Sequence, residues 1–140
     1  MSIIFKGRMP LPPGINQSYK IITLRSRRGM VHTLGPTEAL ETFKYGANIM
    51  LRLQGTQDKD AIEHIQLATR KTPLAVLIRF YFPTLWLRDV DGGIKAAMDA
   101  TFAYLCLNDN MVVRVAAEKR VDRKDPRCEI EVSIVSQEVA

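Results

Sequence analysis

One nine-residue segment constrains the fold of this chain more than any other. Residues 74–82 read LAVLIRFYF, and Pro73 and Pro83 bound them on either side. The segment is rich in β-branched and aromatic residues, which pack well on the pleated surface of a sheet. Because proline is excluded from the interior of helices and sheets, the two prolines mark its limits. The sequence therefore predicts a buried β-strand over 74–82.

The apolar period changes after this strand. Over 92–105, apolar side chains recur at the i, i+3, i+4, i+7 spacing of an amphipathic helix. The members of this stripe are Ile94, Ala97, Met98, Thr101, Phe102 and Leu105. The pattern predicts a helix over 92–105 that packs on the sheet.

Two more helices are expected before the central strand. The first begins near Pro36, which suits the first helical position, and Glu38, which complements the exposed amides of the first turn. Its apolar face runs from Leu40 to Leu51, and Gly55 ends it. A shorter helix is expected over 60–69.

Three further strands are predicted, over 2–9, 111–121 and 128–135. The last two flank a polar turn at 122–127, which indicates a β-hairpin. The whole chain of 140 residues is expected to form one domain over 1–140. The predicted class is α+β, with a mixed sheet of about four strands and helices packed on one face.

The charge balance favours a polyanionic partner. The chain has 20 basic and 15 acidic residues, a formal charge of +5. Basic side chains release counterions when they neutralise phosphates. A basic loop between the first strand and the first helix, with Gly29 at its turning tip, supplies four candidate phosphate contacts; the alternative is a solvated loop. These candidates are Lys20, Arg25, Arg27 and Arg28.

Several protein classes are disfavoured. No apolar run approaches the ~20 residues that span a bilayer, so no membrane partner is expected. The first residues do not resemble a secretory signal. Cys106 and Cys128 lie 22 positions apart, which matches neither a zinc site nor a disulfide framework. These features predict reduced thiols in a cytoplasm.

The candidate chemistry lies just after the central strand. Asp89 and Asp91 are two positions apart, so an extended chain would project both carboxylates to one side. Asp91 is also a candidate N-cap for the helix that follows. Gly92 and Gly93 would allow a ligand to approach the backbone closely.

Other charged residues could join this pair. Lys95 follows Asp91 by one helical turn, and Asp99 follows Lys95 by another. Asp109 comes after the helix, and it returns to the pair only if the connection doubles back along the sheet. Three converging carboxylates would suit Mg²⁺, with Mn²⁺ as an alternative ion. The other interpretation is ordinary capping and solvated acids.

At these residues the sequence resembles the RusA family of Holliday-junction resolvases, crossover-junction endodeoxyribonucleases of bacteria and their phages. Residues 12–19, PPGINQSY, are similar to the family's early Pro-Pro-x-x-Asn-x-x-Tyr signature. Residues 88–100, RDVDGGIKAAMDA, are similar to its Asp-x-Asp-Asn-x-x-Lys-x-x-x-Asp-Ala run. The Asn108-Asp109 step is similar to its later Asp-Asp pair.

The resemblance implies a specific activity. Asp89, Asp91 and Asp109 would bind Mg²⁺ as the catalytic acids, and Lys95 would be the essential basic residue. The family implies a homodimer that recognises four-way junction DNA by its shape and makes paired nicks. Arg88 and Lys119 are further candidates for DNA contacts. This chain departs from the family at Gly92, where Asn is usual, and at Asn108, where an acid is usual.

Two alternatives remain from the sequence. Gly92 and Asn108 favour a catalytically weakened junction-binding or nucleic-acid-binding protein on the same scaffold. A small metal-dependent phosphohydrolase acting on nucleotides is the third hypothesis, although the basic loop argues for a larger substrate.

Trp86 lies three residues before Asp89 and has two possible roles. Its indole either stacks on an unpaired base or is partly buried in packing, and packing is expected.

Overall fold

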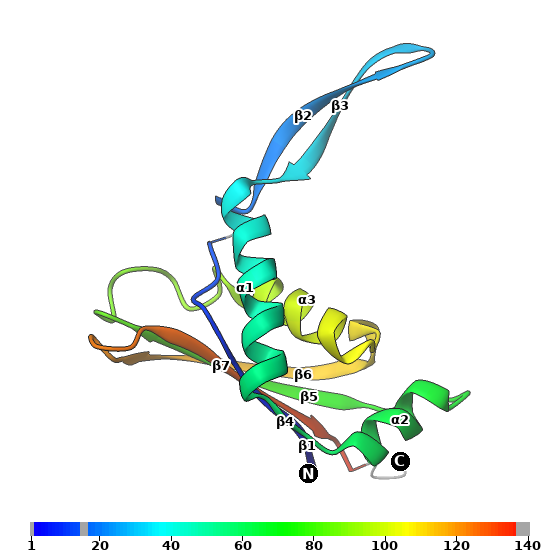
Figure 1. Cartoon of the computed structure of the whole chain (residues 1–140), viewed down its shortest axis with the longest axis vertical. Coiled ribbons are helices and arrows are strands. Elements are labelled where there is room, and N and C mark those ends of the chain that lie inside the picture. The colour runs from blue at the N-terminus through cyan, green and yellow to red at the C-terminus, as the bar shows by residue number, and fades with distance from the viewer. Residues whose placement is uncertain (1, 15–16, 137–140) are drawn as a thin grey trace.

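The computed structural model describes residues 2–14 and 17–136, and within them the chain has an α+β fold (Figure 1). A five-stranded mixed sheet carries the core, and a separate two-stranded sheet projects from it. The strands are β1 (Ser2–Met9), β2 (Tyr19–Ser26), β3 (Gly29–Pro36), β4 (Thr56–Gln57), β5 (Leu74–Phe82), β6 (Val112–Val121) and β7 (Arg127–Ile134). The helices are α1 (Glu38–Gln54), α2 (Lys59–Leu67) and α3 (Ile94–Leu105), with a short 3-10 turn, η2, at Asp109–Met111. The predicted fold class is confirmed.

The central sheet has the strand order β4-β1-β7-β5-β6. β5 pairs antiparallel with β7 and parallel with β6, so the sheet is mixed as predicted. β7 in turn pairs antiparallel with β1, and β1 with the two-residue strand β4. The predicted bounds of β1 and β5 match the observed ones.

The predicted hairpin of the last two strands is wrong, because β5 lies between β6 and β7. The helix α3 carries the chain across the sheet, and such a crossover makes β6 parallel to β5. The polar turn after β6 then crosses the end of β5, where the Asp122 N–H donates to the Phe82 carbonyl at 2.9 Å. A turn signal in a sequence shows where a strand ends, not which strand becomes its neighbour.

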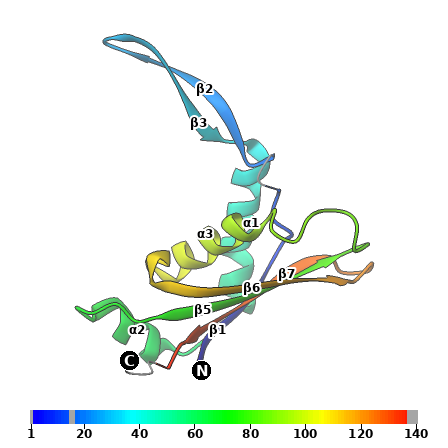
Figure 2. The ribbon, with the colours of Figure 1, turned by 180° about the vertical axis from the view of Figure 1, so that it is seen from behind.

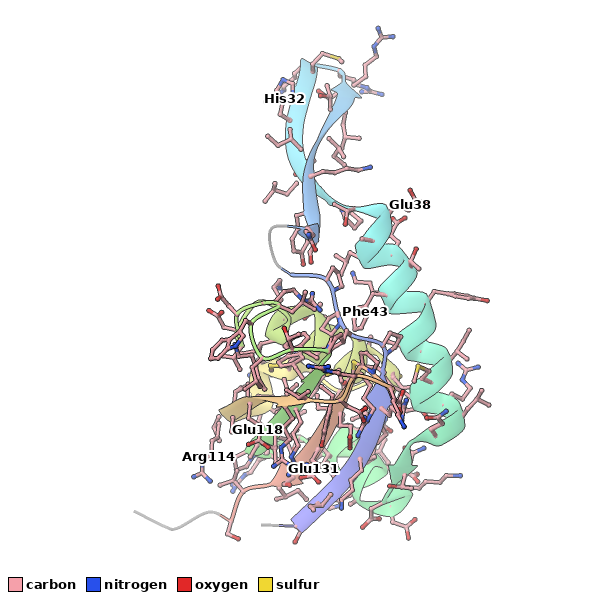
Figure 3. All side chains as sticks on the ribbon, turned by 90° about the vertical axis from the view of Figure 1, so that its left-hand side faces the viewer. His32, Glu38, Phe43, Arg114, Glu118 and Glu131 are labelled. Carbon is pink, nitrogen blue, oxygen red and sulfur yellow. The ribbon has the colours of Figure 1, made fainter. Side chains whose placement is uncertain are left out.

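The core lies between one face of this sheet and the helices α1 and α3. Alternate residues of β5 are buried, from Leu74 to Phe82. The buried side chains of α1 recur at helical spacing, as predicted, and Phe43 lies on the side of α1 that faces the sheet (Figure 3). Figures 1 and 2 show α1 and α3 on the same side of the sheet, whereas α2 lies at its end, beside β1. The prediction that all helices share one face is not confirmed.

The opposite face of the sheet carries charged side chains that pair with one another. Arg79 lies between Glu118, at 2.9 Å, and Glu131, at 3.6 Å, on the strands to either side (Figure 3). Arg127, on β7, pairs with Asp122 of the turn after β6 at 2.8 Å. These ion pairs lie on the face opposite the helices, where they stand among apolar side chains such as Leu77.

The predicted basic loop is instead the hairpin β2–β3, which extends away from the core (Figures 1 and 2). Residues 21–24, IITL, are rich in β-branched side chains and extend the backbone as a strand. Arg27 and Arg28 form the tip, and Gly29, at φ +112°, allows the chain to turn back directly after it. Pro36 ends β3, and the helix α1 is capped by Thr37, whose Oγ1 accepts from the Leu40 N–H at 3.2 Å.

Candidate active site

The loop between β5 and α3 places Asp89 and Asp91 on one cavity of about 640 Å³. Both aspartates are exposed. The other lining residues come from the segment before β2, from the same loop and from β6; they are Gly14, Gln17, Trp86, Leu87, Arg88, Gly92 and Lys119. The cavity therefore joins the base of the basic hairpin to the two carboxylates.

Two cations hold this loop in place. The Arg88 guanidinium donates to the Pro12 carbonyl and lies 5.2 Å from the centre of the Phe82 ring. Its burial lowers the pKa of the Arg88 guanidinium from the ordinary value. The Lys119 ammonium donates to the carbonyls of Leu85, at 2.7 Å, and Arg88, at 3.2 Å. Both residues have structural contacts here, and their contact with DNA stays a prediction.

The carboxylates of Asp89 and Asp91 are left available by the local structure. The expected role of Asp91 as N-cap of α3 is wrong, because Gly93 occupies that position and no side chain caps the helix. The chain turns tightly before α3, with the Ile94 N–H donating to the Asp91 carbonyl at 3.4 Å. Across residues 2–14 and 17–136, neither carboxylate forms an ion pair. Two such carboxylates, with waters and phosphate oxygens, are a ligand set that Mg²⁺ accepts.

Lys95 and Asp99 form an ion pair on α3. The Lys95 ammonium lies 3.5 Å from Asp99 Oδ2, one turn further along the helix. The Lys95 side chain is 60% exposed, so solvent screens this pair and the ammonium can turn to another anion. Lys95 thus lies one turn beyond the loop that carries the aspartates.

Asp109 lies at the other end of the sheet. It precedes β6, and the parallel register places Val112 beside Leu74, the first residue of β5, whereas Asp89 follows the last. The helix between them has 12 residues, which span about 18 Å. Among the described side chains, no three acidic, histidine or cysteine groups are placed to share a metal ion. Within one subunit, the connection therefore does not bring Asp109 back to Asp89 and Asp91.

Asn108 has a structural role in this turn. It caps η2, and its Oδ1 accepts from the Asn110 N–H at 2.9 Å. A carboxylate oxygen could accept the same bond, so the departure from the family's usual acid preserves the local fold.

The β2–β3 hairpin gathers four of the predicted DNA contacts. Lys20, Arg25, Arg27 and Arg28 are all exposed, and no acidic residue occurs between positions 19 and 36. None of the four pairs with an acidic side chain in the described part of the chain. His32, labelled in Figure 3, marks how far this basic arm stands from the sheet.

Trp86 is 85% exposed, so the expectation that it packs is wrong. The aromatic side chains at the end of β5, Phe80 and Phe82, are buried, whereas the indole is presented to solvent. The Lys119 ammonium lies 5.6 Å from its ring centre. Ile15 and Asn16, which belong to the early motif, lie outside the described residues.

Comparison with known proteins gives one family. A family model described as "Endodeoxyribonuclease RusA" matches residues 27–133. The matched segment includes Arg27, Arg28 and the whole stretch from Arg88 to Lys119. A search of curated proteins finds no match. In the described residues, no helix is long and apolar enough to cross a membrane.

Proposed function

The chain belongs to the RusA family of endodeoxyribonucleases, which act on junction DNA, and on that premise we propose that it is a Mg²⁺-dependent nuclease that resolves four-way junctions by paired nicks. The observation that carries the proposal is that two carboxylates without an ion-pair partner among the described residues, those of Asp89 and Asp91, line one cavity near the base of the basic β2–β3 hairpin. We place its activity in a bacterial cytoplasm, where such a junction is a recombination intermediate.

Asp89 and Asp91 would hold the metal ion. Their carboxylates share the cavity and form no ion pairs within the described residues, so a hard cation would not have to displace a protein cation. When bound, the ion would polarise the phosphoryl group, lower the pKa of an attacking water and neutralise the departing oxygen. Lys95 would add positive charge beside the phosphate, where negative charge develops during attack.

The position of Asp109 supports a homodimer. If Asp109 takes part in metal binding, a second copy must supply it, because a single subunit separates it from Asp91 by the length of α3. Each site would then combine Asp89 and Asp91 with the partner's Asp109. A symmetric dimer would present two such sites, which suits the cutting of two equivalent strands.

Mixing two inactive variants tests this arrangement. Asp91→Asn and Asp109→Asn subunits, each inactive alone, should regain one active site when mixed, since the mixed dimer pairs an intact Asp91 with an intact Asp109. The measurement is single nicking of a synthetic four-way junction by the refolded mixture. If both acids acted within one subunit, every site in the mixed dimer would carry a defect and no nicking would return.

The basic hairpin would bind the phosphate backbone. Each phosphate contact contributes about 0.9 to the slope of log K against log salt. Arg27→Ala combined with Arg28→Ala should therefore make this slope shallower by about 1.8. The matched control is Arg70→Ala with Lys71→Ala, two exposed cations after α2, which should leave the slope unchanged. If the hairpin double variant has the same slope as the control double variant, the hairpin is not part of the surface that binds DNA.

A gel assay on a synthetic four-way junction tests the nuclease itself. The wild type should make paired nicks only when Mg²⁺ is added. Asp91→Asn should bind the junction and leave it uncut, because one ligand of the ion is lost. Asp60→Asn, which removes an exposed carboxylate on α2, should cut like the wild type. Cutting by purified Asp91→Asn protein would refute the proposed metal site.

The second candidate is a junction-binding protein without nuclease activity. Its support is the absence, among the described side chains of one subunit, of three metal ligands in one place. Gly92 and Asn108, the two departures from the family pattern, point the same way. A wild type that binds the junction and never nicks it, with Mg²⁺ or Mn²⁺, would favour this candidate.

A further inference from the structure

Trp86 is a large apolar side chain presented to solvent beside the candidate acids. It is the single tryptophan of the chain and is 85% exposed. It lines the same cavity as Asp89 and Asp91. Its neighbours Leu85 and Leu87 are also exposed, at 36% and 55%. An apolar tip of this kind at the edge of a polar cavity is typical of a surface that binds a ligand.

The loop that carries this indole is anchored at several points. The Lys119 ammonium bonds the carbonyls on both sides of Trp86, those of Leu85 and Arg88. The backbone N–H of Trp86 donates to Thr84 Oγ1 at 3.3 Å. The exposure of the ring is therefore fixed by the local fold and does not result from a loose chain.

The indole has a cation over its ring and still has a large area open to solvent. The Lys119 ammonium lies over the ring, 5.6 Å from its centre, in the geometry of a cation–π contact. The large exposed fraction of Trp86 leaves the rest of the ring open to a second planar group. A flat aromatic ligand can stack there, and the ammonium adds positive charge for a neighbouring phosphate.

We propose that Trp86 is a stacking platform for an unpaired nucleobase at the branch point of the DNA, with Lys119 as the positioning residue that holds the platform. The proposal deepens the proposed function and rests on it. Bases inside a duplex have their faces covered by neighbouring pairs, whereas a branch point can offer an open face. Stacking tolerates any base, since every base has a π-face, so Trp86 would select DNA structure without selecting sequence.

The single tryptophan makes the test direct, because emission excited at a wavelength that the four tyrosines do not absorb reports on Trp86 alone. We would titrate the wild type, without divalent metal, with a synthetic four-way junction and with duplex DNA of the same sequence, following saturation by anisotropy. The junction should quench the emission and reduce access of acrylamide to the ring, and the duplex should do neither. Unchanged emission at saturation with junction would overturn the proposal. So would protection that depends on protein concentration alone, which would mean that Trp86 packs against a second copy.

Variants provide an independent measurement. Trp86→Ala should weaken junction binding by about 5- to 150-fold and leave duplex binding unchanged, while Trp86→Phe should retain most of the affinity. Tyr45→Ala, which removes an aromatic ring 74% exposed on α1, is the matched control and should change neither. Equal loss of junction and duplex binding in Trp86→Ala would refute a stacking role.

Lys119→Met tests the positioning role. The variant keeps the length of the side chain and removes the cation, so the loop loses its bonds to the Leu85 and Arg88 carbonyls. In the free protein, the anisotropy of Trp86 emission should be lower than in the wild type, because the released loop lets the ring move more freely. An unchanged anisotropy would contradict the role assigned to Lys119.

Failure of this proposal and failure of the nuclease proposal are distinguishable. A wild type that cuts junctions with Mg²⁺, yet shows no change in Trp86 emission, leaves the nuclease intact and removes the platform. A wild type whose Trp86 is quenched by junction DNA, yet never cuts it, leaves the platform intact and removes the nuclease.

Discussion

Gly93→Ala tests how tightly the candidate site is built onto the fold. Gly93 precedes α3, and a Cβ added to it would lie 2.6 Å from Pro12 Cγ and 3.2 Å from Phe80 Cε1. Carbon atoms in contact prefer about 3.5–4.0 Å, so Pro12 would have to move by roughly 1 Å. Pro12 and Phe80 are both fully buried, and overpacking of this kind costs about 1–3 kcal/mol of the free energy of unfolding.

Thermal unfolding measures the cost. An unfolding entropy of about 2.1 cal/mol/K per residue makes 1 kcal/mol worth about 3 °C in this chain, so Tm should fall by about 3–10 °C. Gly92→Ala is the matched control, because its added Cβ meets Asp89 O at 3.6 Å, an ordinary contact, and Tm should stay within about 2 °C. Gly93→Ser introduces a capping oxygen that the wild type lacks but keeps the added Cβ, so it should also be destabilised. A Gly93→Ala protein as stable as the wild type would refute the close packing of Pro12 on this helix.

Three further predictions concern single side chains. Thr37→Ala removes the cap of α1 and should lower the free energy of unfolding by about 0.5–2 kcal/mol in urea titration. Burial raises the pKa of the Cys128 thiol, and Cys106 is exposed, so a thiol reagent at pH 8 should label one cysteine per native chain and two after denaturation; two in the native state would contradict the burial. The hydrogen bond from Arg127 lowers the pKa of the Asp122 carboxyl, so this pair stabilises the fold above the ordinary value of 3.8 and the contribution is lost as pH falls through the lower folded pKa. Asp122→Asn should therefore make the free energy of unfolding depend less on pH in the acid range. An unchanged pH dependence would contradict the pairing.

The elements of the core were predictable because burial leaves a strong pattern in the sequence. The apolar run of β5 and the stripe of α3 each fix one period, and both were predicted within two residues of their observed bounds. The first helix was predicted for the same reason, with its stop at Gly55; its start was placed near Pro36, which instead ends β3, and the helix begins at Glu38. Where side chains meet a dense interior, the choice of residue follows the period of the backbone.

The pairing of the strands was harder to predict from the sequence. β6 and β7 are adjacent in sequence but separated by β5 in space, since a helical crossover fixed the place of β6. The hairpin β2–β3 was missed because its exposed residues lack the alternation of a half-buried strand. Its partial signal was the β-branched run at 21–24.

The candidate site, like the fold, was predictable only where its residues are close together in the sequence. Asp89 and Asp91 were expected together because they are neighbours in sequence, and they line one cavity. Asp109 depended on the path of the chain, and the parallel register carries it to the opposite end of β5. The exposure of Trp86 depends on how the loop after β5 lies against the rest of the fold, which no local pattern in the sequence records.

The place of β7 has a consequence for how the protein folds. The strand that joins the two halves of the sheet, between β1 and β5, is the last strand along the chain. Until it arrives, β1 has only β4 as a neighbour, and β5 has only β6. Contacts between such distant segments make folding slow. Backbone amides of β1, β5 and β7 should gain protection from hydrogen exchange in one late step, whereas those of α1 and α3 can form local structure earlier.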